Sequence, residues 1–326
     1  MTMQALVTGA GGFIGSHLVE TLVREGAVVR ALVHYDSAGS RGWLDDLPAE
    51  IMAAVDVVAG DVTDPGCVGA AVQGCDTVFH LAALIGIPYS YRAPHSYVAT
   101  NIDGTLAVLE ACRAAGIARL VHTSTSEVYG SPEVVPIAET HRLKPQSPYA
   151  ATKAAADLLA QSYHAAFGLP VVVVRPFNTY GPRQSARAVI PTVITQALAT
   201  GRVRLGATDT LRDFLFVADT ARGFLAAARA PAVEGEVIQV GTGTATSIHA
   251  LVATVADLLG RPLTVESDLQ RLRPVASEVE RLVCDAARAR RLLGWAPTVE
   301  LSAGLGRTID WISSHADRYR PAEYAV

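Results

Sequence analysis

Apolar residues in the first half of the chain fall into two patterns, short β-branched runs and longer segments with helical spacing. The short runs do not alternate with polar residues, which is typical of strands buried on both faces of a parallel sheet. The predicted strands are Gln4–Thr8, Val28–Val33, Val55–Ala59, Thr77–His80, Arg119–Thr123 and Val171–Arg175, and the predicted helices are Ser16–Glu25, Tyr97–Ala115 and Tyr149–Phe167. Their alternation predicts an α/β fold, a doubly wound parallel sheet.

The pattern becomes less regular after the last of these strands. Pro176, Pro182 and Pro191 interrupt it, and we predict irregular structure around them. Regular elements return later, as the predicted helices Asp219–Ala230, Ile248–Leu259 and Ala286–Leu293 and the predicted strand Glu236–Val240.

The length of the chain allows two domains. It has 326 residues, of which half are hydrophobic, so there is enough apolar material for a large core and disorder is excluded. We predict a first domain over residues 1–176, to which residues 214–241 return. A smaller, partly interleaved α/β domain is predicted over residues 177–326.

Charge and composition narrow the function classes. The net charge of −4 argues against a nucleic acid or an anionic membrane as partner, because both attract basic surfaces. No apolar run has the length of a membrane span, and the four cysteines lack metal or redox spacing, so we expect a cytoplasmic protein without a bound metal. Of 27 basic residues only Lys144 and Lys153 are lysines, so a lysine within a motif is informative.

A glycine-rich turn joins the first predicted strand to the first helix. Residues 8–15 read Thr-Gly-Ala-Gly-Gly-Phe-Ile-Gly. Gly9 allows the tight turn, Gly12 lets the backbone approach a pyrophosphate, and Gly15 lets the helix pack closely on the strand. The helix N-terminus then faces the phosphate charge. The motif predicts a dinucleotide cofactor on a Rossmann-type sheet.

A second cluster carries acid–base chemistry. Tyr149 and Lys153 are one helical turn apart, so their side chains share a face. A cation near a phenol favours the phenolate, and we expect Lys153 to lower the pKa of Tyr149 towards neutrality. The segment 123–130, Thr-Ser-Thr-Ser-Glu-Val-Tyr-Gly, follows the fifth strand, at the edge where a doubly wound sheet places its chemistry.

These motifs resemble those of the extended short-chain dehydrogenases/reductases, specifically the NAD-dependent sugar-nucleotide epimerases and dehydratases. Gly60-Asp61-Val62 and His80-Leu81-Ala82-Ala83 agree with the same family. The resemblance favours NAD and leaves NADP open, since His34 and Arg41 offer partners for a 2′-phosphate. Besides the three glycines, Tyr149 and Lys153, the cofactor residues that it implies are Phe13, Ile14, His34, Asp36, Asp61, Val62, Leu81, Ala82, Ala83 and Asn101.

Glu127 distinguishes reactions within this family. The matching residue is usually not acidic in 4-epimerases, whereas in 4,6-dehydratases it is the glutamate that removes the C5 proton. The resemblance makes Thr125 the hydrogen-bond partner of the reacting hydroxyl, and it puts Ser126 where dTDP-glucose 4,6-dehydratases have an acid. GDP-mannose 4,6-dehydratases and UDP-glucuronate decarboxylases both share the Thr-Ser-Glu sequence.

Three stretches look most like bacterial dehydratases that act on UDP- or GDP-N-acetylglucosamine: Leu81–Pro94, Thr123–Gly130 and Arg175–Thr195. Arginine suits the diphosphate of such a substrate, because its planar fork bonds two oxygens. The substrate residues implied are Asn178, Arg187, Arg212, Arg271 and Arg273. In relatives, the helices matching residues 97–115 and 149–167 pack into a homodimer.

We therefore expect a sugar-nucleotide 4,6-dehydratase that forms a 4-keto-6-deoxy sugar by internal hydride transfer through bound NAD. Tyr149, Thr125 and Lys153 would act at C4 and Glu127 at C5, with Glu127 returning its proton to the leaving water because Ser126 is a poor acid. Four alternatives stay open: a UDP-glucuronate decarboxylase, a 4-epimerase, a 5,6-dehydratase that stops at the alkene, and a non-catalytic dinucleotide-binding module.

Overall fold

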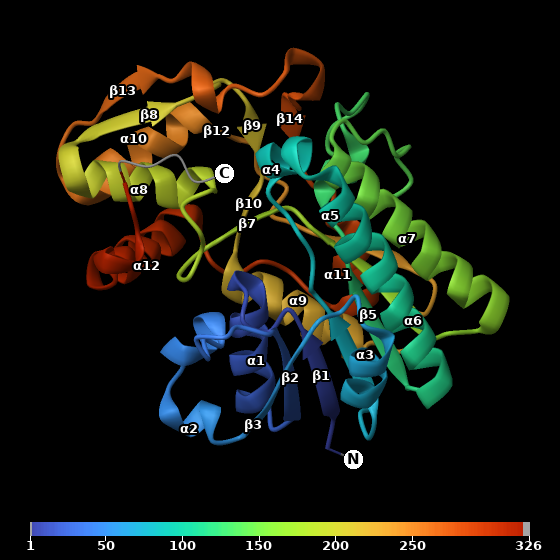
Figure 1. Cartoon of the computed structure of the whole chain (residues 1–326). Helices are drawn as coiled ribbons and strands as arrows, with labels where there is room; N and C mark the ends of the chain where they lie inside the picture. The colour runs from blue at the N-terminus through green and yellow to red at the C-terminus, as the bar shows by residue number, and fades with distance from the viewer. Residues whose placement is uncertain (1, 322–326) are drawn as a thin grey trace.

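A seven-stranded parallel sheet forms the centre of the computed structural model, which describes residues 2–321 (Figure 1). The strand order is β11-β6-β5-β4-β1-β2-β3, so the chain changes direction across the sheet between β1 and β4. The bounds are β1 Gln4–Thr8, β2 Val28–His34, β3 Val55–Gly60, β4 Thr77–His80, β5 Arg119–Thr123, β6 Val171–Pro176 and β11 Val237–Val240. The predicted doubly wound sheet is confirmed.

Two apolar cores cover the two faces of this sheet. One core contains the buried sides of α1 (Phe13–Arg24), α9 (Val217–Arg229) and α11 (Ala287–Leu293). The other contains those of α3 (Pro65–Val72), α6 (Gly104–Ala115) and α7 (Pro148–Phe167). Covering helices on both faces explain why the strand sequences are apolar without alternation.

The predicted helix over residues 97–115 is longer and composite. It begins at α5 (Pro94–Val98), passes through a π-helical turn over Ala99–Asp103, and continues as α6 to a left-handed Gly116. The π-helical turn carries Asn101, whose side chain accepts a hydrogen bond from the backbone N–H of Leu84 in a neighbouring loop. Such turns frequently occur at functional sites.

The second half of the chain forms a third core beside the sheet. Figure 1 shows its helices grouped away from the sheet: α8 (Val189–Thr200), α10 (Ile248–Leu259) and α12 (Leu301–Ser314). The prediction that Pro191 interrupts regular structure is wrong. Pro191 is the third residue of α8, within the first turn, where backbone N–H groups have no helical partner to lose.

Short strands complete this second part. They pair as β7 (Asn178–Tyr180) with β10 (Phe214–Phe216), β8 (Arg202–Leu205) with β13 (Thr264–Ser267), and β9 (Leu211–Arg212) with β12 (Thr246–Ser247) and β14 (Arg281–Leu282). Three further helical segments are η1 (Gly42–Asp46), α2 (Ala49–Met52) and α4 (Ile87–Arg92).

The chain crosses between the two parts more than once. β10 pairs outside the central sheet, whereas α9 and β11 pack with it. Residues between Val279 and Trp295 also enter the first core, which the predicted division leaves out. The domain boundary at residue 176 therefore stays a prediction. Within the described residues, no helix is both long and apolar enough to cross a membrane.

Candidate active site

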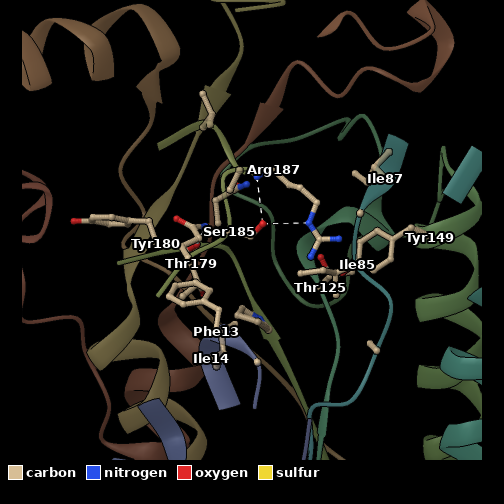
Figure 2. Close-up of a pocket in the computed structure, with 18 of the residues that line it drawn as sticks. Phe13, Ile14, Ile85, Ile87, Thr125, Tyr149, Thr179, Tyr180, Ser185 and Arg187 are labelled. Carbon is tan, nitrogen blue, oxygen red and sulfur yellow. Dashed lines mark hydrogen bonds between the residues drawn. The ribbon is translucent and has the colours of Figure 1, made fainter. Parts of the chain in front are cut away.

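A cavity of about 970 Å³ lies where the chain leaves the carboxyl ends of the parallel strands. Segments at the carboxyl ends of β1, β4, β5 and β6 line one side of the cavity, and residues from the second part of the chain line the other side (Figure 2). All predicted catalytic residues and all predicted substrate residues line it, as do the predicted cofactor residues except Asp61, Val62 and Asn101. One cavity thus collects chemistry from both halves of the sequence.

The glycine-rich turn has the close contacts that its sequence predicts. Gly9 adopts a φ of +67°, and a Cβ there would lie 2.7 Å from the backbone nitrogen of Ala82. A Cβ on Gly15 would lie 2.2 Å from the carbonyl oxygen of Gly9. Gly12 instead borders the cavity, and within 4 Å its Cβ would meet only that same oxygen, at 3.1 Å. Gly9 and Gly15 are needed for packing, and Gly12 leaves room for a ligand.

Helix α1 begins at this turn without a side-chain cap, because Gly12 is its N-cap residue. The N–H groups of its first turn are therefore available to an anion. A neighbouring loop, which the sequence argument missed, covers the turn: the backbone N–H of Trp43 donates to the carbonyl of Gly11 at 2.9 Å. A Cβ on Gly11 would lie 2.5 Å from the carbonyl oxygen of Arg41, so this glycine is needed as well.

Polar residues after β2 and β3 surround one end of the cavity. His34 and Asp36 line it, and Asp36 Oδ1 accepts the backbone N–H of Ala38 at 2.8 Å. Asp61 lies outside the lining, where it accepts both the N–H and the hydroxyl of Thr63 and stands 3.6 Å from His34. Val62 is buried beside Gly104 and does not line the cavity.

The loop after β4 is held by buried hydrogen bonds. His80 bonds the hydroxyl of Thr8 at 2.8 Å, and that oxygen accepts the N–H groups of Leu81 and Ala82. Asn101 is fully buried: its amide oxygen accepts the N–H of Leu84, and its nitrogen donates to the Leu84 carbonyl. Asn101 therefore positions the loop and does not face the cavity.

Local capping places the catalytic candidates. Ser147 caps α7 by accepting the Ala150 N–H at 3.1 Å, which puts Tyr149 and Lys153 on consecutive turns facing the cavity. Thr125 caps a 3-10 turn over Ser126–Tyr129 by accepting the Glu127 N–H at 3.3 Å. Figure 2 shows Thr125 beside the Tyr149 ring.

The expectation that Lys153 lowers the pKa of Tyr149 is wrong for the chain without a ligand. Burial raises the pKa of Tyr149, the charge of Glu127 and the neighbouring Tyr97 raise it further, and only the Thr125 hydroxyl opposes them. Burial lowers the pKa of Lys153 to about 8, with Asp157 opposing. Each group resists its charged form because it is buried.

A buried ionic cluster fixes the strand ends beneath Lys153. Asp157 accepts the hydroxyl of Ser124 at 2.7 Å and the guanidinium of Arg175 at 2.8 Å. His122 stands 3.4 Å from the same carboxylate, and all these side chains are buried. His122, the Arg175 guanidinium and the Ser124 hydroxyl together keep the pKa of Asp157 low despite its burial. The cluster joins β5, β6 and α7, and sequence reasoning missed it.

Glu127 faces a group of arginines from the second part of the chain. Its carboxylate lies 3.8 Å from Arg273 Nη1, which has no hydrogen-bond partner among the described residues. Arg212 is buried and donates to Glu278 at 3.1 Å, and Arg271 pairs with Asp268 at 3.1 Å. Arg212 and Arg273 stand close to Glu127, as a site for an anionic group next to a base would require.

Two further substrate candidates line other walls. Asn178 Oδ1 is buried and finds no partner among the described residues. Arg187 comes from the loop before α8, and its backbone N–H and Nε both donate to the hydroxyl of Ser185, at 3.4 and 3.3 Å (Figure 2). Both side chains therefore have unused hydrogen-bonding capacity at the cavity.

Known proteins are similar to this chain over nearly its whole length. Residues 6–308 match the family model described as GDP-mannose 4,6 dehydratase. A dTDP-glucose 4,6-dehydratase of Streptomyces antibioticus is 36% identical, covering 98% of this chain and 95% of its own. A UDP-glucose 4-epimerase of Mycolicibacterium smegmatis is 35% identical, covering 95% and 98%. The structure of a dTDP-glucose 4,6-dehydratase of Streptomyces venezuelae with NAD bound superposes with a TM-score of 0.88 at 32% identity, covering 98% and 100%.

Proposed function

The chain belongs to the family of NAD-dependent sugar-nucleotide epimerases and dehydratases, and from this premise we propose that it is a 4,6-dehydratase. Its substrate is a nucleoside-diphosphate hexose, UDP- or GDP-N-acetylglucosamine, and its product is the 4-keto-6-deoxy sugar nucleotide. The observation that carries the proposal is Glu127, which lines the same cavity as Thr125, Tyr149 and Lys153.

The residues of the cavity fit NAD. Because Gly12 has no side chain, the backbone at the uncapped start of α1 is accessible, and a pyrophosphate can accept hydrogen bonds from its N–H groups. Arg41 is paired through Nε with Asp45 at 2.7 Å, which offsets part of its charge towards a 2′-phosphate, and this favours NAD over NADP. When bound, NAD supplies a reversible hydride acceptor, so the overall reaction is redox-neutral.

Tyr149 is the base for the C4 hydroxyl. Thr125 hydrogen-bonds the same hydroxyl, since it lies beside the phenol. Lys153 supplies the nearby positive charge that the phenolate requires. Because burial raises the pKa of Tyr149 and lowers that of Lys153, the positive charge of an oxidised nicotinamide, when bound, would help to favour the phenolate.

Glu127 removes the proton from C5 once C4 is a ketone, because the ketone acidifies the neighbouring carbon. Ser126 stands next to it and is a poor acid, so Glu127 also returns a proton to the hydroxyl that leaves C6. A 4-epimerase needs no such second base. Arg212, Arg271, Arg273 and Asn178 hold the diphosphate and the sugar from the opposite wall.

We also propose a homodimer. Val98 and Leu106, on the helical segment from Pro94 to Ala115, and Leu158 and Phe167, on α7, are apolar side chains exposed on the surface. A second copy of the chain would cover them through the same two helices, forming a four-helix interface.

Product mass in deuterated water tests the reaction. The enzyme is incubated with UDP-N-acetylglucosamine, GDP-N-acetylglucosamine and UDP-glucuronate. A 4,6-dehydratase yields a product that has lost water and gained one deuterium at C5. Loss of water without deuterium indicates a 5,6-dehydratase, loss of carbon dioxide a decarboxylase, and an unchanged formula with a new configuration a 4-epimerase. Bound NAD without turnover of any sugar nucleotide indicates a binding module.

A further inference from the structure

Arg187 differs from the other arginines of the cavity. Six arginines line it: Arg41, Arg187, Arg212, Arg271, Arg273 and Arg318. Five of them have a carboxylate within 4 Å. Within residues 2–321, Arg187 makes no ion pair, and its hydrogen bonds go to Ser185, on its own loop. Because the hydrogen bonds to Ser185 use the backbone N–H and Nε, the Nη1 and Nη2 groups of Arg187 can still donate to a ligand.

The guanidinium lies beside the loop after β4. A Cβ on Gly86 would be 3.5 Å from Arg187 Nη1 and 3.4 Å from the Tyr97 hydroxyl oxygen. Burial raises the pKa of Tyr97, and the charge of Arg187 opposes this, as expected for close neighbours. Figure 2 shows the Arg187 side chain extending towards the side of the cavity that carries Ile85, Thr125 and Tyr149. Arg187 therefore reaches the wall where the sugar reacts.

The neighbouring surface is apolar. Ile85 lines the cavity with 57% of its surface exposed, and Ile87 packs with Tyr97 and Tyr149 in a small buried cluster. An exposed isoleucine next to a guanidinium presents a hydrophobic contact and a planar donor together. A carboxylate could pair with the guanidinium but would leave the isoleucine without a hydrophobic partner, whereas an acetamido group has a carbonyl oxygen for the arginine and a methyl for the isoleucine.

The diphosphate does not require Arg187. Arg212 and Arg273 already stand together beside Glu127 and Glu278. Burial lowers the pKa of Arg212, the charges of Glu127 and Glu278 oppose this, and the charge of Arg273 adds to it. Arg187 lies instead beside Gly86 and Tyr97, so the two cationic positions have different neighbours. One anion can use the first position, which leaves Arg187 to read a different part of the substrate.

We propose that Ile85 and Arg187 form a subsite for the acetamido group of an N-acetylated sugar. The carbonyl oxygen accepts from the Arg187 fork, and the methyl lies against Ile85. Ser185 is a positioning residue, because its hydroxyl binds Nε and turns the fork towards the sugar. The subsite rests on the proposed function, which places the sugar at Tyr149 and Thr125 and makes it an N-acetylated one.

The test compares sugars that differ in the acetamido group alone. Arg187→Met keeps the side-chain length and removes the donors. We expect it to lower kcat/KM for UDP- and GDP-N-acetylglucosamine by about 10- to 100-fold, the value of one charge-assisted hydrogen bond. Activity on UDP- and GDP-glucose should change less than about 3-fold. Ile85→Ser should reduce the same discrimination, and Arg204→Met, on an exposed arginine paired with Glu266, is the matched control.

Calorimetry separates failure of the subsite from failure of the reaction. Binding of each sugar nucleotide to the NAD-loaded Tyr149→Phe variant is measured with and without Arg187→Met. Selective loss of affinity for the N-acetylated sugars supports the subsite, whichever reaction the enzyme performs. Equal loss for both sugars would assign Arg187 to the diphosphate, and a larger loss for UDP-glucuronate would assign it to a carboxylate. Either result, or no change in affinity, overturns the proposal even if dehydration is found.

Discussion

Replacing Gly15 by alanine tests how the cofactor turn is built. The added Cβ would lie 2.2 Å from the carbonyl oxygen of Gly9 and 3.0 Å from Ala10 Cα. Carbon and oxygen at van der Waals contact are more than 3 Å apart, so α1 or the turn has to move by about 1 Å. Overpacking of this kind costs about 1–3 kcal/mol, and the shift displaces the N–H groups that face the pyrophosphate.

Gly69, in α3, provides a matched control. A Cβ on Gly69 would meet nothing within 4 Å, so Gly69→Ala should stabilise the protein by about 0.5–1 kcal/mol through helix propensity alone. Urea unfolding gives the stability of both variants, and calorimetric titration gives their affinity for NAD. We expect Gly15→Ala to lose stability and at least about tenfold in affinity, and Gly69→Ala to keep its affinity. A Gly15→Ala variant that unfolds and binds NAD like the wild type would refute the close-packing argument.

Two further predictions concern stability and assembly. Burial lowers the pKa of His17 to about 4. Between the usual histidine pKa and about pH 4, the unfolded chain therefore binds a proton that the folded chain does not bind. The free energy of unfolding is highest near neutral pH and falls on acidification, by at most about 3 kcal/mol. His17→Gln, which can still donate to the Pro182 carbonyl, should reduce this acid loss in urea titrations near pH 7 and about pH 5, and an unchanged loss would assign it to other groups. Leu158→Glu adds a charge to the proposed dimer face, where the side chain is 58% exposed, and light scattering should then find the mass of a monomer with an unchanged melting temperature; a persisting dimer would place the interface elsewhere.

Residues that act within their own turn or helix were predictable. A Cβ on Gly15 would meet Gly9 and Ala10, in the same strand–turn–helix unit, and Tyr149 and Lys153 are related by helical spacing alone. Local sequence therefore contains the reason for each of them. The same applies to the strands, because apolar runs between glycines and helical segments need no distant partner to be recognised.

Residues that act through distant contacts were not predictable. Arg318 reaches the cavity from the C-terminal region by pairing with Asp46, 272 residues away, and it belongs to no motif. Trp43 covers the glycine-rich turn from a loop without periodicity. The pKa of Tyr149 depends on burial, which helical spacing does not report. Pro191 shows the converse error, since a residue that breaks helices internally is accepted in the first turn of α8.

The mass of the sugar nucleotide formed by Glu127→Gln tests the central claim most directly. Glutamine keeps the size of the side chain and removes the base, while Thr125, Tyr149 and Lys153 remain. With UDP- or GDP-N-acetylglucosamine and NAD, we expect this variant to accumulate reduced nicotinamide while the sugar nucleotide retains its water. The wild type should release water from the same substrate. Normal loss of water by Glu127→Gln would contradict the account, because the second base would then lie elsewhere.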